Sequence, residues 1–287
     1  MARPQIEFIQ AQTMPWDKGP LGAARPGVEA RVLSIDDQNG ESSMLLRYPA
    51  GWEQAGEEYL LVHEEIFVLE GAVEIAGIEY GRHFYAYLPA GYARPTASST
   101  DGAVVLSFYS ATPKAEKGAP AGGLYDDALL IKALDTINMP FDDRPFDTEM
   151  DPLINQGHNK TLRKDPYTDG WTFLFGSFAQ SHPKDWAGQL ETHECVEEFY
   201  LLSGELHAGN CGVMQPGAYF WRPPHIEHGP YGTIGGYFGF FRCIHGPMYN
   251  IWTDYKVDFE YYPPHKPAVP PELEKYAKDP LAGVSNY

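Results

Sequence analysis

The sequence has few cysteines, a deficit of basic residues and no long apolar run. Its three cysteines form no CxxC pair, which argues against a disulfide framework and favours a reducing cytosol. Lysine and arginine number 21 against 39 aspartates and glutamates, a formal net charge of −18. Nucleic acids and anionic membranes attract basic surfaces, so we expect neither as a partner. No stretch approaches the roughly 20 apolar residues of a membrane span and no signal-peptide core opens the chain, so we expect a cytoplasmic protein.

What the sequence does contain is the composition of a turn-rich β protein. Its 287 residues are 43% hydrophobic, with 29 glycines and 25 prolines, which is enough apolar material for one large or two ordinary domains. Helical periodicity is restricted to Asp126–Thr136 and the stretch around Pro271–Lys278. Short runs rich in β-branched and aromatic residues, bounded by turn formers, predict strands and an all-β fold. These runs are Ser43–Tyr48, Glu65–Leu69, Val73–Ile75, Phe84–Leu88, Val104–Tyr109, Thr172–Phe178, Glu198–Leu202, Tyr219–Arg222 and Tyr237–Arg242.

The strand pattern occurs twice along the chain. Glu64–Gly71 corresponds to Glu197–Gly204, 133 positions later, and Leu88–Gly91 corresponds to Arg222–His225, 134 positions later. Two blocks of like spacing separated by a nearly constant shift indicate a duplicated domain. We therefore predict domains at 1–135 and 136–260, joined through the charged segment Asp135–Asp151, followed by a proline-rich extended tail at 261–287.

Four residues of the second block have the chemistry of a metal site. Residues two apart on a strand share a face, so Glu191 and His193 are expected to point into the same interior. Glu197 follows on the next predicted strand, and His228 lies downstream in a loop. Imidazole and carboxylate groups converging from separate strands suit a divalent cation in a small barrel. We predict His193, Glu197 and His228 as ligands, with Glu191 either a fourth ligand or a base that holds an imidazole proton.

These residues and their spacing resemble the cupin superfamily, whose two motifs are G-x5-HxH-x3,4-E-x6-G and G-x5-PxG-x2-H-x3-N. The first motif matches at His193, Glu197 and Gly204, and the second at Gly217, Pro223 and His228. The sequence departs from the motifs at Glu191 in place of the first histidine, His225 in place of a glycine and Gly232 in place of the asparagine. The resemblance covers about 43–109 and 171–242, so it implies two tandem cupin barrels of the double-stranded β-helix, or jelly-roll, type.

The segment Glu191–His193 is also similar to the C-terminal metal site of ureidoglycine aminohydrolases, which are bicupins. Those enzymes bind manganese through a Glu-x-His pair, a further histidine and a residue of the later motif. Glu197 stands here in place of the further histidine. The resemblance implies a divalent metal, iron(II) or manganese(II) first, with zinc or nickel also considered.

The first block has lost the metal ligands. Its corresponding positions are Glu58, Leu60, Glu64 and Arg94. Leucine cannot coordinate a metal, and arginine is a permanent cation. We predict that the Arg94 guanidinium fills the vacated position and is neutralised by Glu64, and by Glu58 as a second candidate, because a buried cation is costly without a partner.

The residues around the predicted site have plainer alternatives. Arg222 is a candidate catalytic residue that clamps a substrate carboxylate, or else a surface ion-pair partner. His225 is expected to face solvent and Cys195 to pack in the core. Glu194, Glu198 and Glu227 are expected on a solvated face. Alternation sends some rings of the aromatic runs into the lumen, so we expect an aromatic-lined pocket.

Three functions are compatible with these features. The first is a metal-dependent bicupin enzyme acting on a small carbonyl or carboxylate compound, including aromatic ones, for which the family resemblance favours iron(II)-dependent dioxygenation with carbon–carbon cleavage. The second is a non-redox manganese hydrolase of the ureidoglycine aminohydrolase kind, a lyase or an isomerase. The third is a catalytically silent barrel that binds a sugar or another small ligand. Paired cupin barrels commonly bury a strand or an edge in a neighbour, so a homodimer is compatible with each.

Overall fold

The computed structural model describes residues 3–120, 122–142, 157–179, 182–183, 185–209, 211–278 and 287. The chain divides into two compact units. The N-terminal unit comprises Met1–Arg3 and Pro15–Met139, and the C-terminal unit comprises Pro4–Met14 and Pro140–Tyr287. Of the segment Asp135–Asp151, in which we predicted the domain boundary, residues 143–151 lie outside the described residues.

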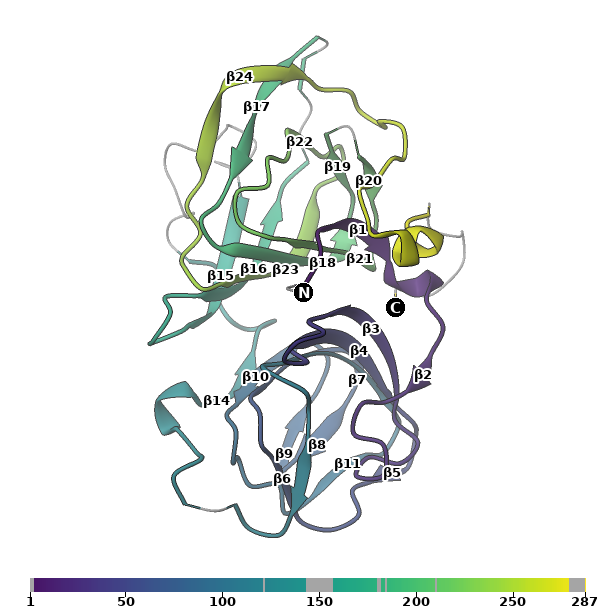
Figure 1. Ribbon diagram of the computed structural model, residues 1–287, viewed down its shortest axis with the longest axis vertical. Coiled ribbons are helices and arrows are strands. Elements are labelled where there is room, and N and C mark those ends of the chain that lie inside the picture. Colours follow the sequence, from purple (N-terminus) through teal and green to yellow (C-terminus); the bar gives the residue numbers. More distant parts are fainter. Residues whose placement is uncertain are drawn as a thin grey trace. The chain divides into compact units, whose positions relative to one another are not determined.

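The N-terminal unit is a two-layered antiparallel β-structure (Figure 1). Among its described residues, the larger sheet has seven strands in the order β14 (Ile131–Asp135), β10 (Phe84–Leu88), β7 (Glu64–Gly71), β12 (Ala103–Tyr109), β4 (Ser42–Tyr48), β3 (Glu29–Ile35) and β2 (Asp17–Lys18). The smaller layer joins β5 (Trp52–Glu53), β11 (Ala97–Ser99), β8 (Val73–Ile75) and β9 (Ile78–Tyr80), beside the pair β13 (Ala115–Lys117) and β6 (Glu58–Leu60). One 3-10 turn, η2 (Asp127–Leu129), precedes β14.

The C-terminal unit repeats this plan. In its described part, the larger sheet has six strands in the order β1 (Ile6–Gln10), β21 (Ala218–Arg222), β18 (Val196–Gly204), β23 (Tyr237–Ile244), β16 (Trp171–Ser177) and β15 (Gly157–Lys164). The remaining strands form the pair β17 (Ala187–Thr192) with β24 (Ile251–Asp258) and the group β20 (Gly212–Met214), β19 (Leu206–Ala208) and β22 (Tyr231–Gly232). The 3-10 turns are η1 (Ala11–Thr13) and η4 (Pro271–Tyr276).

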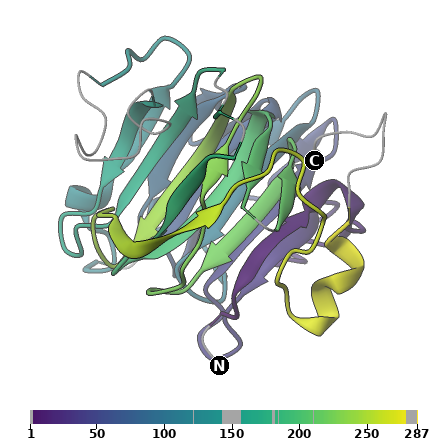
Figure 2. The same cartoon turned by 90° about the horizontal axis from the view of Figure 1, so that it is seen from above.

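The first strand of the chain belongs to the second barrel. β1 pairs antiparallel with β21, with Ile6 opposite Trp221 and Ile9 opposite Tyr219. Figure 2 shows this purple strand alongside the green strands of the C-terminal sheet. A segment at the N-terminus therefore completes a sheet whose other strands begin after residue 156.

Alternation along the central strands directs two kinds of side chain into each barrel. On β7, Ile66 and Val68 belong to the buried core of the N-terminal unit, so Glu64 points to the same face. On β18, Phe199 and Leu201 belong to the core of the C-terminal unit, which places Glu197 in its interior. In each unit, the central strand therefore directs apolar side chains and one glutamate into the interior. Glu64 and Glu197 lie at the same end of their respective strands.

The predicted all-β fold is confirmed, and each of the nine expected strands overlaps one in the structure. The helix predicted at Asp126–Thr136 is wrong. That segment forms η2 and then β14, whose Leu134 lies opposite Tyr85 of β10. Pairing with an available sheet edge outweighs weak helical periodicity in so short a segment. Among the described residues, no helix has the length and apolar character to cross a membrane.

The internal duplication is visible in the backbone. An isolated antiparallel bridge joins Glu58 to Arg94 in the N-terminal unit, and another joins Glu191 to His228 in the C-terminal unit. These four residues are the ones that the sequence offsets placed in correspondence. The two units therefore hold equivalent positions in equivalent backbone settings, although their side chains differ.

Candidate metal centre

Three buried side chains of the C-terminal unit converge on one point. One ligand atom from each of Glu191, His193 and His228 lies within 4.8 Å of the other two. Glu191 is near the end of β17 and His193 follows one residue after that strand. His228 is held beside them because Glu191 and His228 each donate a backbone N–H to the other's carbonyl, both at 3.0 Å. The sequence prediction named all three of these residues.

The outer hydrogen bonds of the two histidines fix which ring nitrogen faces the centre. His193 Nδ1 lies 3.0 Å from the carbonyl oxygen of Tyr249, and His228 Nδ1 lies 2.7 Å from that of Ile226. A carbonyl oxygen can only accept, so each Nδ1 carries a proton, and in the neutral form of each ring Nε2 presents a lone pair. The two Nε2 atoms lie 3.2 Å apart. Two neutral rings in this arrangement direct their lone pairs at each other in the interior of the barrel.

Glu197 adds a second carboxylate to this centre. Its Oε2 lies 3.4 Å from His228 Nε2 and 3.8 Å from His193 Nε2. The same oxygen accepts a hydrogen bond from Arg222 Nη1 at 2.8 Å. Glu197 is thus adjacent to both imidazoles but is also engaged by a guanidinium, which distinguishes it from Glu191.

Arg222 is held between two carboxylates. Its Nε and Nη2 donate to the two oxygens of Glu7, at 3.3 and 2.6 Å, while Nη1 donates to Glu197. Burial alone would lower the pKa of Arg222, but Glu7, Tyr231 and Glu197 raise it well above its ordinary value. Arg222 is only 1% exposed, so the surface ion pair considered from the sequence is wrong. In this arrangement it neutralises carboxylates of the chain itself.

Sequence reasoning missed Glu7. It lies on β1, 215 residues before Arg222, and is 4% exposed. The sequence signal for this segment was the alternation of apolar Ile6, charged Glu7 and apolar Phe8, which is typical of a strand. Nothing in the sequence indicated that this strand would join the second barrel.

Burial and charge keep the imidazole of His228 neutral. Burial, the Arg222 guanidinium and His193 all lower the pKa of His228, well below its usual value. Burial also raises the pKa of two phenols, Tyr231 and Tyr237, and the carboxylates of the site add to that effect. His228 is therefore neutral and the two phenols are protonated around neutral pH.

Aromatic rings fill the core of the same barrel. Phe199 packs against Phe241 at a tilt, with ring centroids 4.3 Å apart, and Phe173 stacks parallel to Phe241 at 5.2 Å. The Arg222 guanidinium lies 3.6 Å from the ring centroid of Phe220, within cation–π distance. Of the predicted ligands, His228 has its ring centroid 6.0 Å from that of Tyr231.

Several neighbouring residues are not part of the centre. His225 is exposed beside Glu194, as predicted, and Cys195 is a buried thiol of the core. The expectation that Glu198 lies on a solvated face is wrong. Glu198 is 2% exposed, accepts from Tyr219 at 2.6 Å and pairs with Arg242 at 2.5 Å.

The equivalent place in the N-terminal unit is filled by guanidinium groups. Arg94 Nη1 donates to Glu64 Oε2 at 2.5 Å, which confirms the predicted pair. Arg25, which the sequence did not single out, lies 3.2 Å from Glu64 and 3.7 Å from Glu58. Leu60 supplies no donor atom. This barrel has exchanged a metal-binding set for an internal salt-bridge network.

The donor set of the C-terminal centre fits a divalent cation. Glu191, Glu197 and the Nε2 atoms of two neutral imidazoles are all acceptors, which is the kind of donor set that a cation binds. Two histidines with carboxylate ligands and open positions suit iron(II) or manganese(II) better than a thiolate-preferring ion. Both rings donate Nδ1–H to a backbone carbonyl, as metal-bound histidines commonly do. This hydrogen bond leaves Nε2 of each ring facing the centre.

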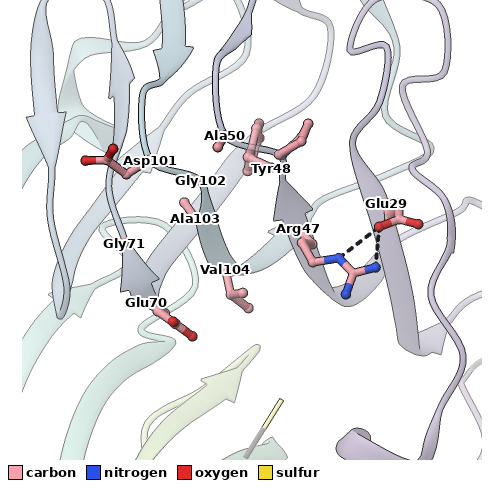
Figure 3. A pocket seen from close by; sticks show the side chains of 11 residues that line it. Glu29, Arg47, Tyr48, Ala50, Glu70, Gly71, Asp101, Gly102, Ala103 and Val104 are labelled. Carbon is pink, nitrogen blue, oxygen red and sulfur yellow. Dashed lines mark hydrogen bonds and ion pairs between the residues drawn. The ribbon is translucent and has the colours of Figure 1, made fainter. Parts of the chain in front are cut away.

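A separate surface hollow in the N-terminal unit has a different character. It measures about 530 Å³ and is bordered by Tyr48, Gly71 and Gly102 at the ends of β4, β7 and β12. Figure 3 shows Arg47 and Glu29 pointing toward each other at one side, where they form an ion pair. No histidine or cysteine is among the described residues that line it. The hollow is therefore not a second metal-binding candidate.

Two jelly-roll units, one with a buried His/Glu cluster at one end of its central strand, have the cupin type of fold. Residues 7–242 match a family described as Domain of unknown function (DUF4437), and the chain belongs to that family. Comparison with curated proteins gives no match.

Solved structures share the fold at low sequence identity. A dioxygenase candidate from Nostoc punctiforme PCC 73102 is similar with a TM-score of 0.72 and 18% identity, over 91% of this chain and 92% of that chain. The protein YlbA from E. coli, of DUF861, has a TM-score of 0.55 and 12% identity, over 84% and 92%. Oxalate decarboxylase from Bacillus subtilis has a TM-score of 0.52 and 11% identity, over 85% and 78%.

Proposed function

We propose that this protein is a bicupin enzyme that uses iron(II) in its C-terminal barrel to oxygenate a small carbonyl or carboxylate compound. The observation that carries the proposal is the pair of Nε2 lone pairs 3.2 Å apart, bordered by a carboxylate on each side. A set of two histidines and one carboxylate with open positions is typical of non-haem iron(II) oxygenases. The similarity to a dioxygenase candidate is in keeping with this choice.

The chain's own residues have separate tasks in this proposal. Glu191, His193 and His228 hold the ion, and the carbonyl groups of Tyr249 and Ile226 orient the two imidazoles. Iron(II) bound there would supply coordination sites for dioxygen and for an oxygen atom of the substrate. Arg222 acts as a positioning residue that fixes the Glu197 carboxylate, because Glu7 holds its other edge. The surrounding phenylalanines limit the access of water and favour substrates with apolar or aromatic parts.

Oxygen consumption tests the proposal. The protein is loaded anaerobically with iron(II) and offered 1,3-diketones, 2-oxo acids and hydroxylated aromatic acids in an oxygen electrode. We expect substrate-dependent oxygen uptake that His193→Ala abolishes. His225→Ala is the matched control, because this exposed histidine contacts Glu194 and not the centre. Turnover of a substrate at the same rate without oxygen would overturn the assignment.

A second function is favoured by the position of Glu197. If both glutamates coordinate, the charge of a divalent ion is balanced and a redox-inactive manganese(II) centre for hydrolysis, lyase or isomerase chemistry becomes suitable. The Glu-x-His pair shared with ureidoglycine aminohydrolases supports this alternative. It predicts anaerobic turnover of a ureido compound or a hydroxy acid with manganese(II), and elemental analysis of the purified protein separates it from the iron proposal.

A further inference from the structure

The salt-bridge network of the N-terminal barrel leaves one edge of a guanidinium without an acceptor. Arg94 is 1% exposed, and its Nη1 donates to Glu64. Its Nε and Nη2 are buried and contact no hydrogen-bond acceptor in the described part of the chain. Nε–H and Nη2–H point the same way from a planar guanidinium, and together they match the two oxygens of a carboxylate.

In the C-terminal barrel, the same edge of an arginine binds a carboxylate. In the C-terminal unit, Arg222 uses Nη1 for Glu197, the counterpart of Glu64, and uses Nε and Nη2 for the carboxylate of Glu7. Arg94 makes the first of these interactions and lacks the second. A buried donor pair without an acceptor costs free energy, so an acceptor from outside the chain, a carboxylate or a water molecule, would stabilise this edge.

The buried charges of the network are balanced, because Arg25 and Arg94 stand against Glu58 and Glu64. Lys117, 3.5 Å from Glu58, adds one positive charge at the surface, where its side chain is 54% exposed. An anion on the free edge of Arg94 would balance that charge. The Tyr48 hydroxyl oxygen accepts a hydrogen bond from Arg25 Nη1 at 2.8 Å, and the Tyr109 hydroxyl donates one to Glu64 at 2.6 Å.

A further donor lies in the same core. The indole Nε1 of Trp52 is buried and has no acceptor among the described residues. The Trp52 ring packs edge-on against Tyr48 with centroids 4.9 Å apart, and Tyr48 in turn contacts Arg25. The described groups of this core without a hydrogen-bond partner thus include N–H donors of Arg94, Arg25 and Trp52 and the acceptor Glu58 Oε1, which lies 3.7 Å from Arg25 Nε.

We propose that the N-terminal barrel is a binding site for a small monocarboxylate, which lies on the Nε/Nη2 edge of Arg94. In this proposal the N-terminal barrel binds a carboxylate, whereas the C-terminal barrel binds a metal ion. The site is separate from the proposed metal centre and does not depend on the reaction assigned to it.

Acetate is the simplest probe, and acetamide is its uncharged counterpart of the same shape. Binding is measured by isothermal titration calorimetry and by the melting temperature, with the full chain carrying His193→Ala so that acetate cannot bind through a metal ion. We expect acetate to bind and to raise the melting temperature, and acetamide to do neither. Absence of acetate binding, or equal binding of acetamide, overturns the proposal.

Two variants assign the effect to Arg94. Arg94→Lys keeps the charge that faces Glu64 but removes the forked edge, so acetate affinity should fall at least about tenfold. Arg47→Lys is the matched control, because Arg47 belongs to the same unit but pairs with Glu29 on the surface, and it should bind acetate like the parent. Equal affinity in a folded Arg94→Lys protein contradicts the proposal. If that variant does not fold, the comparison of acetate with acetamide still decides the question.

Discussion

His193 and His228 face each other through Nε2 atoms 3.2 Å apart. Each Nδ1 proton is donated to a backbone carbonyl on the far side. Two neutral rings held in this way present lone pairs to each other, a contact that a cation between or beside the two nitrogens makes favourable. The stability of the C-terminal unit should therefore depend on metal.

Chelation is expected to destabilise the protein. A site that is saturated at about 100 times its Kd contributes about 2.7 kcal/mol, which is lost when the metal is removed. Differential scanning calorimetry with and without EDTA measures the loss, and readdition of iron(II) or manganese(II) should reverse it. His193→Ala should melt at the same temperature with and without EDTA, and His225→Ala should behave like the parent. An EDTA effect of full size in His193→Ala would contradict this.

Replacement of Glu7 is expected to destabilise the C-terminal unit strongly. Glu7→Gln leaves the buried Arg222 with Glu197 as its remaining carboxylate partner, and breaking a buried pair on one side costs about 3 kcal/mol. Urea unfolding monitored by circular dichroism measures the change. Glu194→Gln is the control, because that side chain is largely exposed. A loss for Glu7→Gln as small as that of the control would show that the pair contributes little.

The free energy of unfolding should depend on pH in the acid range, because the charged Glu64 carboxylate is paired with arginines in the folded protein. Burial alone would raise the pKa of Glu64, but Arg25 and Arg94 lower it from 4.5 to about 2. A carboxyl whose pKa is lower in the folded state stabilises the protein above the unfolded value, and this contribution is lost as the pH falls from 4.5 toward 2.

The lost contribution is about 3 kcal/mol, since one pKa unit corresponds to about 1.4 kcal/mol. Urea unfolding at about pH 5 and about pH 3 should show a smaller loss in Glu64→Gln than in the parent protein. Glu79→Gln, at an exposed position of the same unit, should keep the parental pH dependence. If the parent and Glu64→Gln lose the same free energy over this range, Glu64 is not the group responsible.

Two glycines of the N-terminal unit should respond differently to the same substitution. Gly71 and Gly77 both have positive φ, +67° and +76°. A Cβ at Gly71 would lie 2.0 Å from the carbonyl oxygen of Gly102, whereas a Cβ at Gly77 would meet nothing within 4 Å. Each alanine costs about 1–2 kcal/mol for the backbone conformation, and Gly71→Ala should cost at least about 2 kcal/mol more for displaced backbone. Equal melting temperatures for the two variants would refute this difference.

The strands and the metal-binding candidates could be predicted because their signals are local. Alternating apolar residues marked strands such as β7 and β18, and Glu191 with His193 formed a pair spaced two residues apart at the end of β17. The helix predicted at Asp126–Thr136 failed because the pairing of β14 with β10 depends on a sheet edge that the segment itself does not reveal.

The partners of Arg25 and Arg222 could not be predicted, because they are distant in the chain and, unlike Arg94 and Glu64, do not fall on corresponding motif positions. Glu7 and Arg222 are 215 residues apart, and Arg25 reaches Glu64 from a segment with no strand signal. Glu198 was assigned to solvent because a charged residue in a strand usually faces water, yet Arg242 and Tyr219 satisfy it in a buried position. Ion pairs of this kind depend on tertiary contacts rather than on spacing.

The position of β1 has a consequence for biosynthesis. Ile6–Gln10 leaves the ribosome early, but its partner Ala218–Arg222 is translated more than two hundred residues later. The second barrel therefore cannot be closed until nearly the whole chain has been synthesised, and long-range pairing of this kind slows folding. A fragment that starts at Pro140 would lack both an edge strand and the carboxylate of Glu7, so the C-terminal half should not fold as a complete barrel on its own.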